Sequence, residues 1–212
     1  MTIVQATLLN SLLDLVFPPK CEVCKKSGPA ALCPDCFTSI KFMKPEYGIH
    51  SAALYDGAIR TAIHRFKFDK RKKLAEPLGI LLVQYLGQNP ALKMKELDSI
   101  VPVPLHRRRQ RARGFNQIDL LARIISRYYE LPVLNSLERV RDTKPHFELP
   151  REERFTNIKG AFKVARPHDV KDKRILLLDD IYTTGATITE CSKALTKAGA
   201  RRIEVLTLAR AV

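Results

Sequence analysis

The stretch of sequence that decides the fold is RILLLDDIYTTGAT, residues 174–187. It opens with a short apolar run, which predicts a buried strand over residues 174–178. Two acids, Asp179 and Asp180, follow at the carboxyl end of that strand. A hydroxyl-rich turn with a glycine comes next and opens a helix. The stretch therefore predicts a strand, an acidic end, a turn and a helix in immediate succession.

The turn after the two acids has the features of an anion-binding site. Free amide groups and the positive end of the helix dipole favour an anion there. Gly185 allows the backbone to approach that anion, because glycine carries no side chain and tolerates dihedral angles that other residues resist. Thr183, Thr184 and Thr187 can add hydroxyl donors. We therefore expect the turn to bind a monophosphate, and a side chain at position 185 to weaken that binding.

The two acids that precede this turn add a second kind of binding group, a pair of hydrogen-bond acceptors. Ligands of open α/β sheets bind in the crevice beyond the carboxyl ends of the strands, so we expect Asp179 and Asp180 to be exposed in such a crevice. Carboxylates there can accept hydrogen bonds from a sugar diol, and together with the turn they indicate a ribose 5-phosphate site. The alternative is a plain helix cap with solvated acids. The segment matches neither a Walker loop nor a dinucleotide fingerprint.

Short apolar strands alternate with helical patterns on both sides of this stretch. Strands are predicted at residues 52–55, 100–103 and 203–208, and apolar residues have helical spacing at 74–85, 118–125 and 188–198. This alternation is typical of βαβ units and predicts an α/β fold with a mostly parallel sheet flanked by helices. Between residues 137 and 160 the pattern lapses into a charged, proline-containing segment, which we interpret as a candidate lid.

The charge of the chain points to anionic partners. Its 212 residues include 37 Lys and Arg against 22 Asp and Glu, a formal net charge of +15. Such a surface attracts nucleic acid, acidic lipid or a phosphate-rich small substrate, and charge alone does not choose among them. Two basic clusters, residues 65–73 and 106–113, stand out. Tryptophan, the best platform for base stacking, is absent.

The first 17 residues are strongly apolar but do not resemble an export signal. They have no basic leader, and Asn10, Ser11 and Asp14 interrupt the apolar run, so we predict neither a signal peptide nor a membrane span. The apolar residues fall on one helical face, which predicts a short amphipathic helix. We therefore expect a cytoplasmic protein whose cysteines stay reduced.

Two CxxC pairs separated by eight residues supply four thiolates, from Cys21, Cys24, Cys33 and Cys36. In a reducing compartment this spacing predicts tetrahedral binding of one Zn²⁺. Two disulfides, a redox CxxC and an iron–sulfur cluster are the alternatives. Four thiolates leave no open coordination position, so the zinc is expected to be structural. The predicted organisation is an N-terminal helix and zinc-binding knuckle over residues 1–45, followed by the α/β domain over 46–212.

At this point the residues resemble a known family. LLLDDIYTTGAT (176–187) is similar to the loop with which type I phosphoribosyltransferases bind phosphoribosyl pyrophosphate (PRPP). VPVPLHRRRQRARGFNQ (101–117), the doubled CxxC, FKFDKRKKLA (66–75) and GAFKV (160–164) resemble the ComF family, in particular its competence-associated ComFC proteins. The resemblance spans nearly the whole chain.

The resemblance implies a role for each part of the site. Asp179 and Asp180 would hold the ribose 2′ and 3′ hydroxyls, and the 5′-phosphate would lie in the loop formed by Thr183, Thr184, Gly185, Ala186 and Thr187. It also implies contact between pyrophosphate and the basic loop, where Arg107, Arg109 and Arg113 are the candidate catalytic residues. Mg²⁺ would accompany PRPP. In the lid, relatives have a Gln where this chain has His146, and the motif is otherwise echoed by Thr143, Leu149, Arg154 and Asn157.

Two functions are consistent with this resemblance. The first is a phosphoribosyltransferase in which arginines and Mg²⁺ stabilise the departing pyrophosphate, in a protein associated with DNA uptake and natural transformation. The second is a non-catalytic competence factor that binds single-stranded DNA and keeps the pocket for nucleotide sensing. Phe66, Phe68 and Phe115 lie beside basic residues, as in single-strand binders, although a core role for these rings is equally expected. A competence-machinery protein such as a helicase is a further expected partner.

Overall fold

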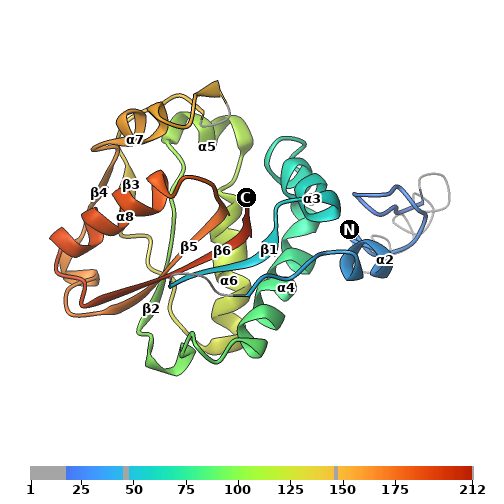
Figure 1. Cartoon of the computed structure of the whole chain (residues 1–212), viewed down its shortest axis with the longest axis horizontal. Helices are drawn as coiled ribbons and strands as arrows, with labels where there is room; N and C mark the ends of the chain where they lie inside the picture. The colour runs from blue at the N-terminus through green and yellow to red at the C-terminus, as the bar shows by residue number, and fades with distance from the viewer. Residues whose placement is uncertain (1–17, 45–47, 146–147, 212) are drawn as a thin grey trace, which may run out of the picture.

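The centre of the fold is a parallel sheet with the strand order β1-β6-β5-β2 (Figure 1). The structure, a computed structural model, describes residues 18–44, 48–145 and 148–211. The four strands of this sheet are β1 (Ile49–Leu54), β2 (Ser99–Pro102), β5 (Arg174–Tyr182) and β6 (Arg202–Arg210). β5 and β6 pair from Arg174 with Arg202 to Tyr182 with Arg210. The prediction of a mostly parallel α/β sheet is therefore confirmed.

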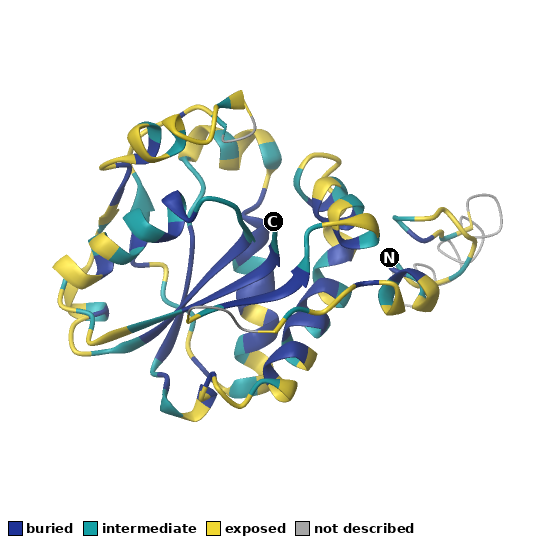
Figure 2. Cartoon of the chain, in the orientation of Figure 1, coloured by how far each residue is buried: buried dark blue, intermediate teal, exposed yellow. Residues whose placement is uncertain are grey.

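Helices cover both faces of this sheet, because β5 carries apolar side chains on both sides. Leu176 and Leu178 belong to one buried cluster, and Ile175 and Leu177 belong to the other, as the alternation of a strand requires. The first face is covered by α3 (Gly57–Lys67), α4 (Ala75–Gln88) and α6 (Gln117–Tyr129). The second is covered by α8 (Ala186–Lys197), with α7 (Glu153–Ile158) beside it. Figure 2 shows the buried strands between these two layers.

Short elements complete the described part of the chain. They are α2 (Pro34–Thr38), α5 (Arg107–Arg113), η1 (Lys72–Leu74), η2 (Met94–Glu96) and η4 (Pro167–Asp169). α4 and α6 pack closely, and a Cβ at Gly79 would lie 2.5 Å from Ile124 Cδ1. A glycine is therefore needed where these two helices cross.

Within the described residues, each strand and helix expected from periodicity occurs within a few residues of its predicted position. The amphipathic helix predicted over residues 1–17 lies outside the described residues. Among the described residues, no helix combines the length and apolar character that crossing a bilayer requires.

The segment predicted as an irregular lid is partly regular. It begins with β3 (Leu137–Arg139) and ends with α7, and β3 pairs antiparallel with β4 (Phe162–Val164). Leu137, Ile158 and Phe162 are buried in the cluster that also contains α8. The segment 137–160 is therefore anchored at both ends on the second face of the sheet, and its action as a lid stays a prediction.

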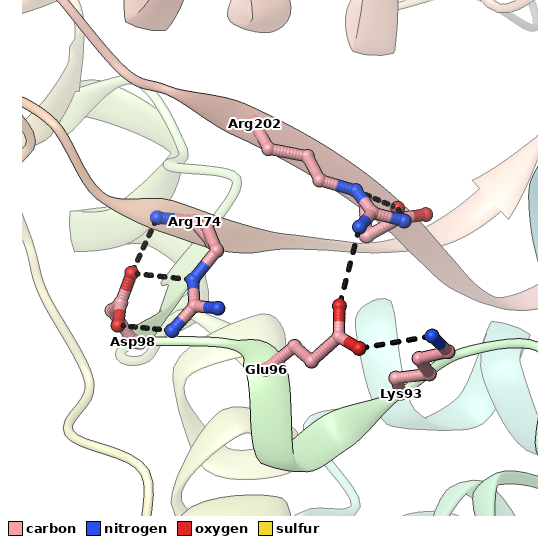
Figure 3. Close-up of polar contacts among 6 residues, drawn as sticks. Lys93, Glu96, Asp98, Arg174 and Arg202 are labelled. Atoms are coloured by element: carbon pink, nitrogen blue, oxygen red, sulfur yellow. Dashed lines mark hydrogen bonds and ion pairs between the residues drawn. The ribbon is translucent and has the colours of Figure 1, made fainter.

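An ion-pair network joins the amino ends of β2, β5 and β6 (Figure 3). Asp98 accepts hydrogen bonds from the backbone N–H of Arg174 at 2.7 Å and from its guanidinium at 3.1 and 3.2 Å. Glu96 lies 3.5 Å from Arg202 and 3.0 Å from Lys93. The hydrogen bonds from Arg174 lower the pKa of Asp98 to about 2. This network fixes the register of the strands at the end of the sheet opposite the carboxyl ends.

We predict that Asp98→Asn lowers the free energy of unfolding at pH 7 by about 1 kcal/mol, a value discounted for partial exposure of the pair. Because the folded-state pKa is depressed, the contribution of Asp98 is present above pH 4 and is lost as the pH falls towards 2. The difference between wild type and variant should therefore shrink over that range. Denaturant unfolding at several pH values measures it. Glu96→Gln, which removes a more exposed carboxylate of the same network, is the control, and an equal loss in both variants would contradict the special role of Asp98.

Candidate functional site

Asp179 and Asp180 lie within β5 rather than beyond it. The prediction that both carboxylates are exposed is wrong, because each residue is only 8% exposed. The physical reason is that β5 continues to pair with β6 through Asp179 with Thr207 and on to Tyr182 with Arg210. The backbone N–H of Asp180 also donates to Asp179 Oδ1 at 2.8 Å. The two acids are therefore held in a fixed geometry at the carboxyl end of a central strand.

Two side chains from distant parts of the chain contact the Asp180 carboxylate. Lys67 Nζ, at the last residue of α3, lies 2.8 Å from Asp180 Oδ1. Gln117 Nε2, at the first residue of α6, donates to Asp180 Oδ2 at 2.6 Å. Gln117 is placed there by the start of α6, where the Asn116 side chain caps the helix by accepting from the N–H of Ile118. The ends of α3 and α6 therefore meet at Asp180.

Burial and the neighbouring acid raise the pKa of Asp179 to about 7. The larger cause of this raised pKa is loss of water around the carboxylate, and the second is repulsion by Asp180. Strongly perturbed carboxyl groups at the end of a central strand are typical of functional sites. The pair therefore holds a group that can keep or release a proton near neutral pH.

The turn after β5 has the geometry predicted for an anion site. Gly185 has φ of 80°, in the left-handed region, and a Cβ there would lie 2.6 Å from the Tyr182 hydroxyl oxygen. α8 starts at the next residue, Ala186, so its first amide groups point out of the turn without intrahelical acceptors. Thr184 Oγ1 accepts from the N–H of Ala186 at 3.4 Å. Thr183 and Thr187 lie on either side of this turn, both partly exposed.

Of the three arginines predicted to be catalytic, the structure brings Arg109 and Arg113 to this region. Arg113 donates to Gln117 Oε1, and burial lowers the pKa of its guanidinium while the Asp180 carboxylate opposes that shift. Arg109 donates to the Thr143 carbonyl oxygen. Arg107 is instead exposed on α5 and lines a cavity of about 620 Å³ whose lining also includes Arg139. The lining of that cavity contains neither acid of β5 nor the turn after it.

Sequence reasoning missed Arg139, the last residue of β3. Its guanidinium donates to Thr143 Oγ1, while its buried Nε has no hydrogen-bond partner. Burial, followed by repulsion from Arg109, lowers its pKa to about 10. The nearby Asp179 carboxylate opposes this shift. No sequence signal marks Arg139 as inward-facing, because the strand that carries it pairs with β4, more than twenty residues later in the chain.

The lid residues that echo the family motif hold the segment 143–157 together. Asn157 donates to the carbonyl oxygen of Lys144 at 3.0 Å and accepts from its N–H at 3.1 Å. Arg154 Nε donates to the Leu149 carbonyl oxygen at 3.3 Å. Thr143 is the point at which Arg109 and Arg139 meet. His146 lies outside the described residues, so its role in this segment stays a prediction.

The four cysteines of the knuckle converge as a metal site requires. Their Sγ atoms all lie within 4.8 Å of one another, and Cys24 Sγ is 3.6 Å from Cys33 Sγ. Tetrahedral zinc with Zn–S bonds of 2.3 Å places thiolates about 3.8 Å apart. Cys21 Sγ also accepts from the N–H groups of Val23 and Cys33, both at 3.4 Å. The residues therefore fit a structural Zn²⁺, which would be held by Cys21, Cys24, Cys33 and Cys36.

Two family models match the chain. A double zinc ribbon domain matches residues 12–50, and a phosphoribosyl transferase domain matches residues 121–211. Together with the parallel sheet and the four-thiolate cluster, these matches define a class: a phosphoribosyltransferase-type α/β domain that carries an N-terminal zinc ribbon.

Curated relatives narrow this class to a family. The chain is 40% identical over 154 residues to competence protein F of Haemophilus influenzae, an alignment that covers 70% of this chain and 66% of that protein. It is 30% identical over 205 residues to the DNA utilization protein YhgH of Escherichia coli, covering 90% and 89%. It is 30% identical over 203 residues to the competence protein ComFC of Streptococcus pneumoniae, covering 95% and 85%. The chain belongs to the ComF family.

We predict one Zn²⁺ per chain, lost in Cys24→Ser and Cys36→Ser, because four thiolates share the coordination free energy. Metal analysis of purified protein measures the ratio. Cys191→Ala is the matched control, since Cys191 is buried in the cluster around α8 and should leave zinc at one per chain. Zinc retained in full by the knuckle variants, or absent from the wild type, would contradict this assignment.

Proposed function

We propose that the carboxyl end of β5 binds the ribose 5-phosphate part of PRPP or of a nucleotide. The observation that carries this proposal is the direct succession of Asp179, Asp180 and the Gly185 turn at the start of α8. Carboxylates accept hydrogen bonds from the ribose 2′ and 3′ hydroxyls, and the turn offers amide and hydroxyl donors to a phosphate.

The cations around the two acids extend the same site towards pyrophosphate. Lys67 comes from the end of α3, and Arg109 and Arg113 both come from α5; the three cations lie near the acids or near one another. Arginine binds phosphate oxygens in a forked geometry and stays charged, which suits a departing pyrophosphate. Mg²⁺ bound to the pyrophosphate would share in neutralising that charge. Arg139, with an unpartnered Nε, is a further donor for this anion.

The chemistry that this arrangement supports is electrostatic. Loss of pyrophosphate from ribose C1 builds positive charge on the sugar and negative charge on the leaving group, and fixed arginines stabilise the latter. The nucleophile that would then attack C1 is the acceptor of the transfer reaction. The names of the relatives, competence protein and DNA utilization protein, support a role of this site in DNA uptake and use.

We predict that Asp179→Asn with Asp180→Asn reduces the affinity for ribose 5-phosphate and PRPP at least about 100-fold, since both acceptors for the diol lose their charge. Calorimetry with each ligand, with and without Mg²⁺, measures binding, and pyrophosphate release from PRPP in the presence of a panel of bases and amines measures transfer. Asp172→Asn, which changes an exposed acid just before β5 at the opposite end of that strand, is the control. Unchanged affinity in the double variant would refute the site, and binding without turnover would favour a nucleotide-binding function.

The effect of Asp179→Asn on stability distinguishes a ligand-binding role of this acid from a structural role. The raised pKa of Asp179 means that its ionised form is disfavoured in the folded state, so its ionisation costs stability increasingly from about pH 4 to pH 7. Asp179→Asn should therefore not lower the thermal midpoint at pH 8, even as it abolishes binding.

A second candidate function, binding of single-stranded DNA, is favoured by the surface of α5. Arg107, Arg108 and Arg111 are exposed, and the Arg108 side chain is 85% exposed. The Arg113 guanidinium lies 5.7 Å from the centre of the Phe68 ring, which is half exposed. Charge beside an exposed ring is the arrangement with which single strands are bound without sequence preference.

We predict weak binding of single-stranded DNA with steep salt dependence. Changing Arg107, Arg108 and Arg111 to Gln should lower the slope of log K against log salt by about 2, because each phosphate contact on a single strand contributes about 0.7. A labelled oligonucleotide titrated at several salt concentrations measures the slope. Changing Lys171, Lys193 and Lys197 to Gln, on the α8 side, removes equal charge as a control. Competition by pyrophosphate would place the strand on the arginines near Asp180, and no binding at low salt would remove this function.

A further inference from the structure

One acid of the zinc knuckle lies against the end of α3. Glu22 directly follows the zinc ligand Cys21, and its carboxylate is 3.6 Å from Arg71 Nε and 4.0 Å from Arg65 Nη1. The Glu22 side chain is only 15% exposed, whereas Arg65 is 24% and Arg71 54% exposed, so the contact is shielded from water on the side of the carboxylate. Lys25 of the knuckle lies 3.4 Å from the same carboxylate. Glu22 is therefore the carboxylate that links the knuckle to the turn at residues 65–71.

The same turn carries Lys67, whose Nζ lies 2.8 Å from Asp180. The proposed ribose-phosphate site around Asp179, Asp180 and Gly185 is called the ribose crevice below. Arg65 and Lys67 are two residues apart, so they point from nearly opposite sides of the helix end. Backbone hydrogen bonds to the Arg65 carbonyl oxygen, from Asp69 at 3.1 Å and Arg71 at 3.2 Å, close the turn. A closed turn moves as a unit, so a displacement at Arg65 also displaces Lys67. Figure 1 shows α3 between the knuckle and the sheet.

This turn carries an excess of like charge, although Phe66 beside it is buried in the core. Residues 65–73 include six cations and one acid, Asp69. Repulsion among the cations favours an open, solvated turn, and in the shielded contact the Glu22 carboxylate opposes it. At the other side Asp180 does the same for Lys67 at 2.8 Å. The turn is therefore fixed between two carboxylates, one on the knuckle and one in the crevice.

We propose that Glu22 is a positioning residue of the ribose crevice, which holds Lys67 on Asp180 through the end of α3 as long as zinc holds Cys21. Zinc retention and ligand occupancy are then coupled, and the coupling acts in both directions. The knuckle thereby has a role in ligand binding beyond its own folding. The part of this inference that concerns ligand affinity, its ligand arm, rests on the proposed ribose-phosphate site. The part that concerns zinc retention, its zinc arm, does not depend on that site.

The ligand arm compares Glu22→Gln with Asp35→Asn in the full, zinc-loaded chain. Both changes replace a knuckle carboxylate beside a cysteine ligand, but Asp35 pairs with Lys26 within the knuckle, at 2.8 Å. We expect the dissociation constant for ribose 5-phosphate, measured by calorimetry, to rise by about threefold or more in Glu22→Gln and to change less than about twofold in Asp35→Asn. Metal analysis checks that both variants keep one zinc per chain.

The comparison of variants that tests zinc retention needs no ligand. Lys67→Met removes the contact with Asp180, and Lys73→Met removes an exposed charge of the same segment. Transfer of zinc to a chromogenic chelator should be about threefold faster or more in Lys67→Met and unchanged in Lys73→Met. In the wild type, saturating ribose 5-phosphate should slow the transfer, and in Glu22→Gln it should have no effect.

The outcomes separate this inference from the proposed function. Equal ligand affinity in Glu22→Gln and Asp35→Asn, with binding by the wild type, overturns the inference and leaves the ribose-phosphate site standing. Loss of zinc from Glu22→Gln also overturns it, because Glu22 would then act on the metal site itself. A wild type that binds no ribose 5-phosphate refutes the proposed function, and the Lys67→Met and Lys73→Met transfer rates then decide the inference alone.

Discussion

The rest of the structure depends on two adjacent carboxylates buried at the carboxyl end of β5. Burial of one ionised carboxylate is costly, and burial of two neighbours adds their repulsion. β5 nevertheless holds both, because its pairing with β6 fixes the backbone beyond them. Lys67, Gln117 and the arginines, which come from segments distant in sequence, surround the two carboxylates and supply positive charge and hydrogen-bond donors. The ends of α3, α5, α6 and β3 lie where they bring these donors and cations to the two carboxylates.

The zinc knuckle is stabilised in a different way, because it lacks a hydrophobic core of its own. A segment of this size cannot bury enough apolar surface to fold alone, so thiolate coordination takes the place of a core. Yet Cys21, Leu32, Cys36 and Ile40 belong to the same buried cluster as Phe66 of α3. The knuckle is therefore packed on the α/β body, and its metal stabilises a surface against which α3 rests.

Much of the fold could be predicted from the sequence because its signals are local. The apolar run at 174–178 and the helical spacing of Ile118 and its neighbours decide element type without reference to the rest of the chain. The thiolates could be predicted in the same way, since CxxC pairs bring their ligands together by spacing alone. The burial of Asp179 and Asp180 could not, because it depends on how far β5 pairs with a strand some twenty residues later in the chain. The roles of Lys67 and Arg139 could not be predicted for the same reason. Lys67 is one cation of the basic cluster 65–73 and Arg139 lies in the charged segment 137–160, and only tertiary packing shows that both face the acids.

The charges at the crevice do not balance within the described residues, and this imbalance indicates what the site is built to receive. Lys67, Arg109, Arg113 and Arg139 face the two carboxylates of β5 and Asp142, which lies 3.8 Å from Arg109, so cations outnumber acids four to three. Lowered pKa values of Arg113 and Arg139 show that their burial is incompletely compensated, and the unpartnered Nε of Arg139 marks a donor without an acceptor. A neutral ligand would leave this excess in place. A ligand with several phosphate oxygens and a hydroxylated sugar would complete both halves of the site at once, since its anionic groups pair with the arginines while its hydroxyls donate to the acids. Electrostatics and hydrogen-bond accounting therefore both support the proposed ribose-phosphate ligand.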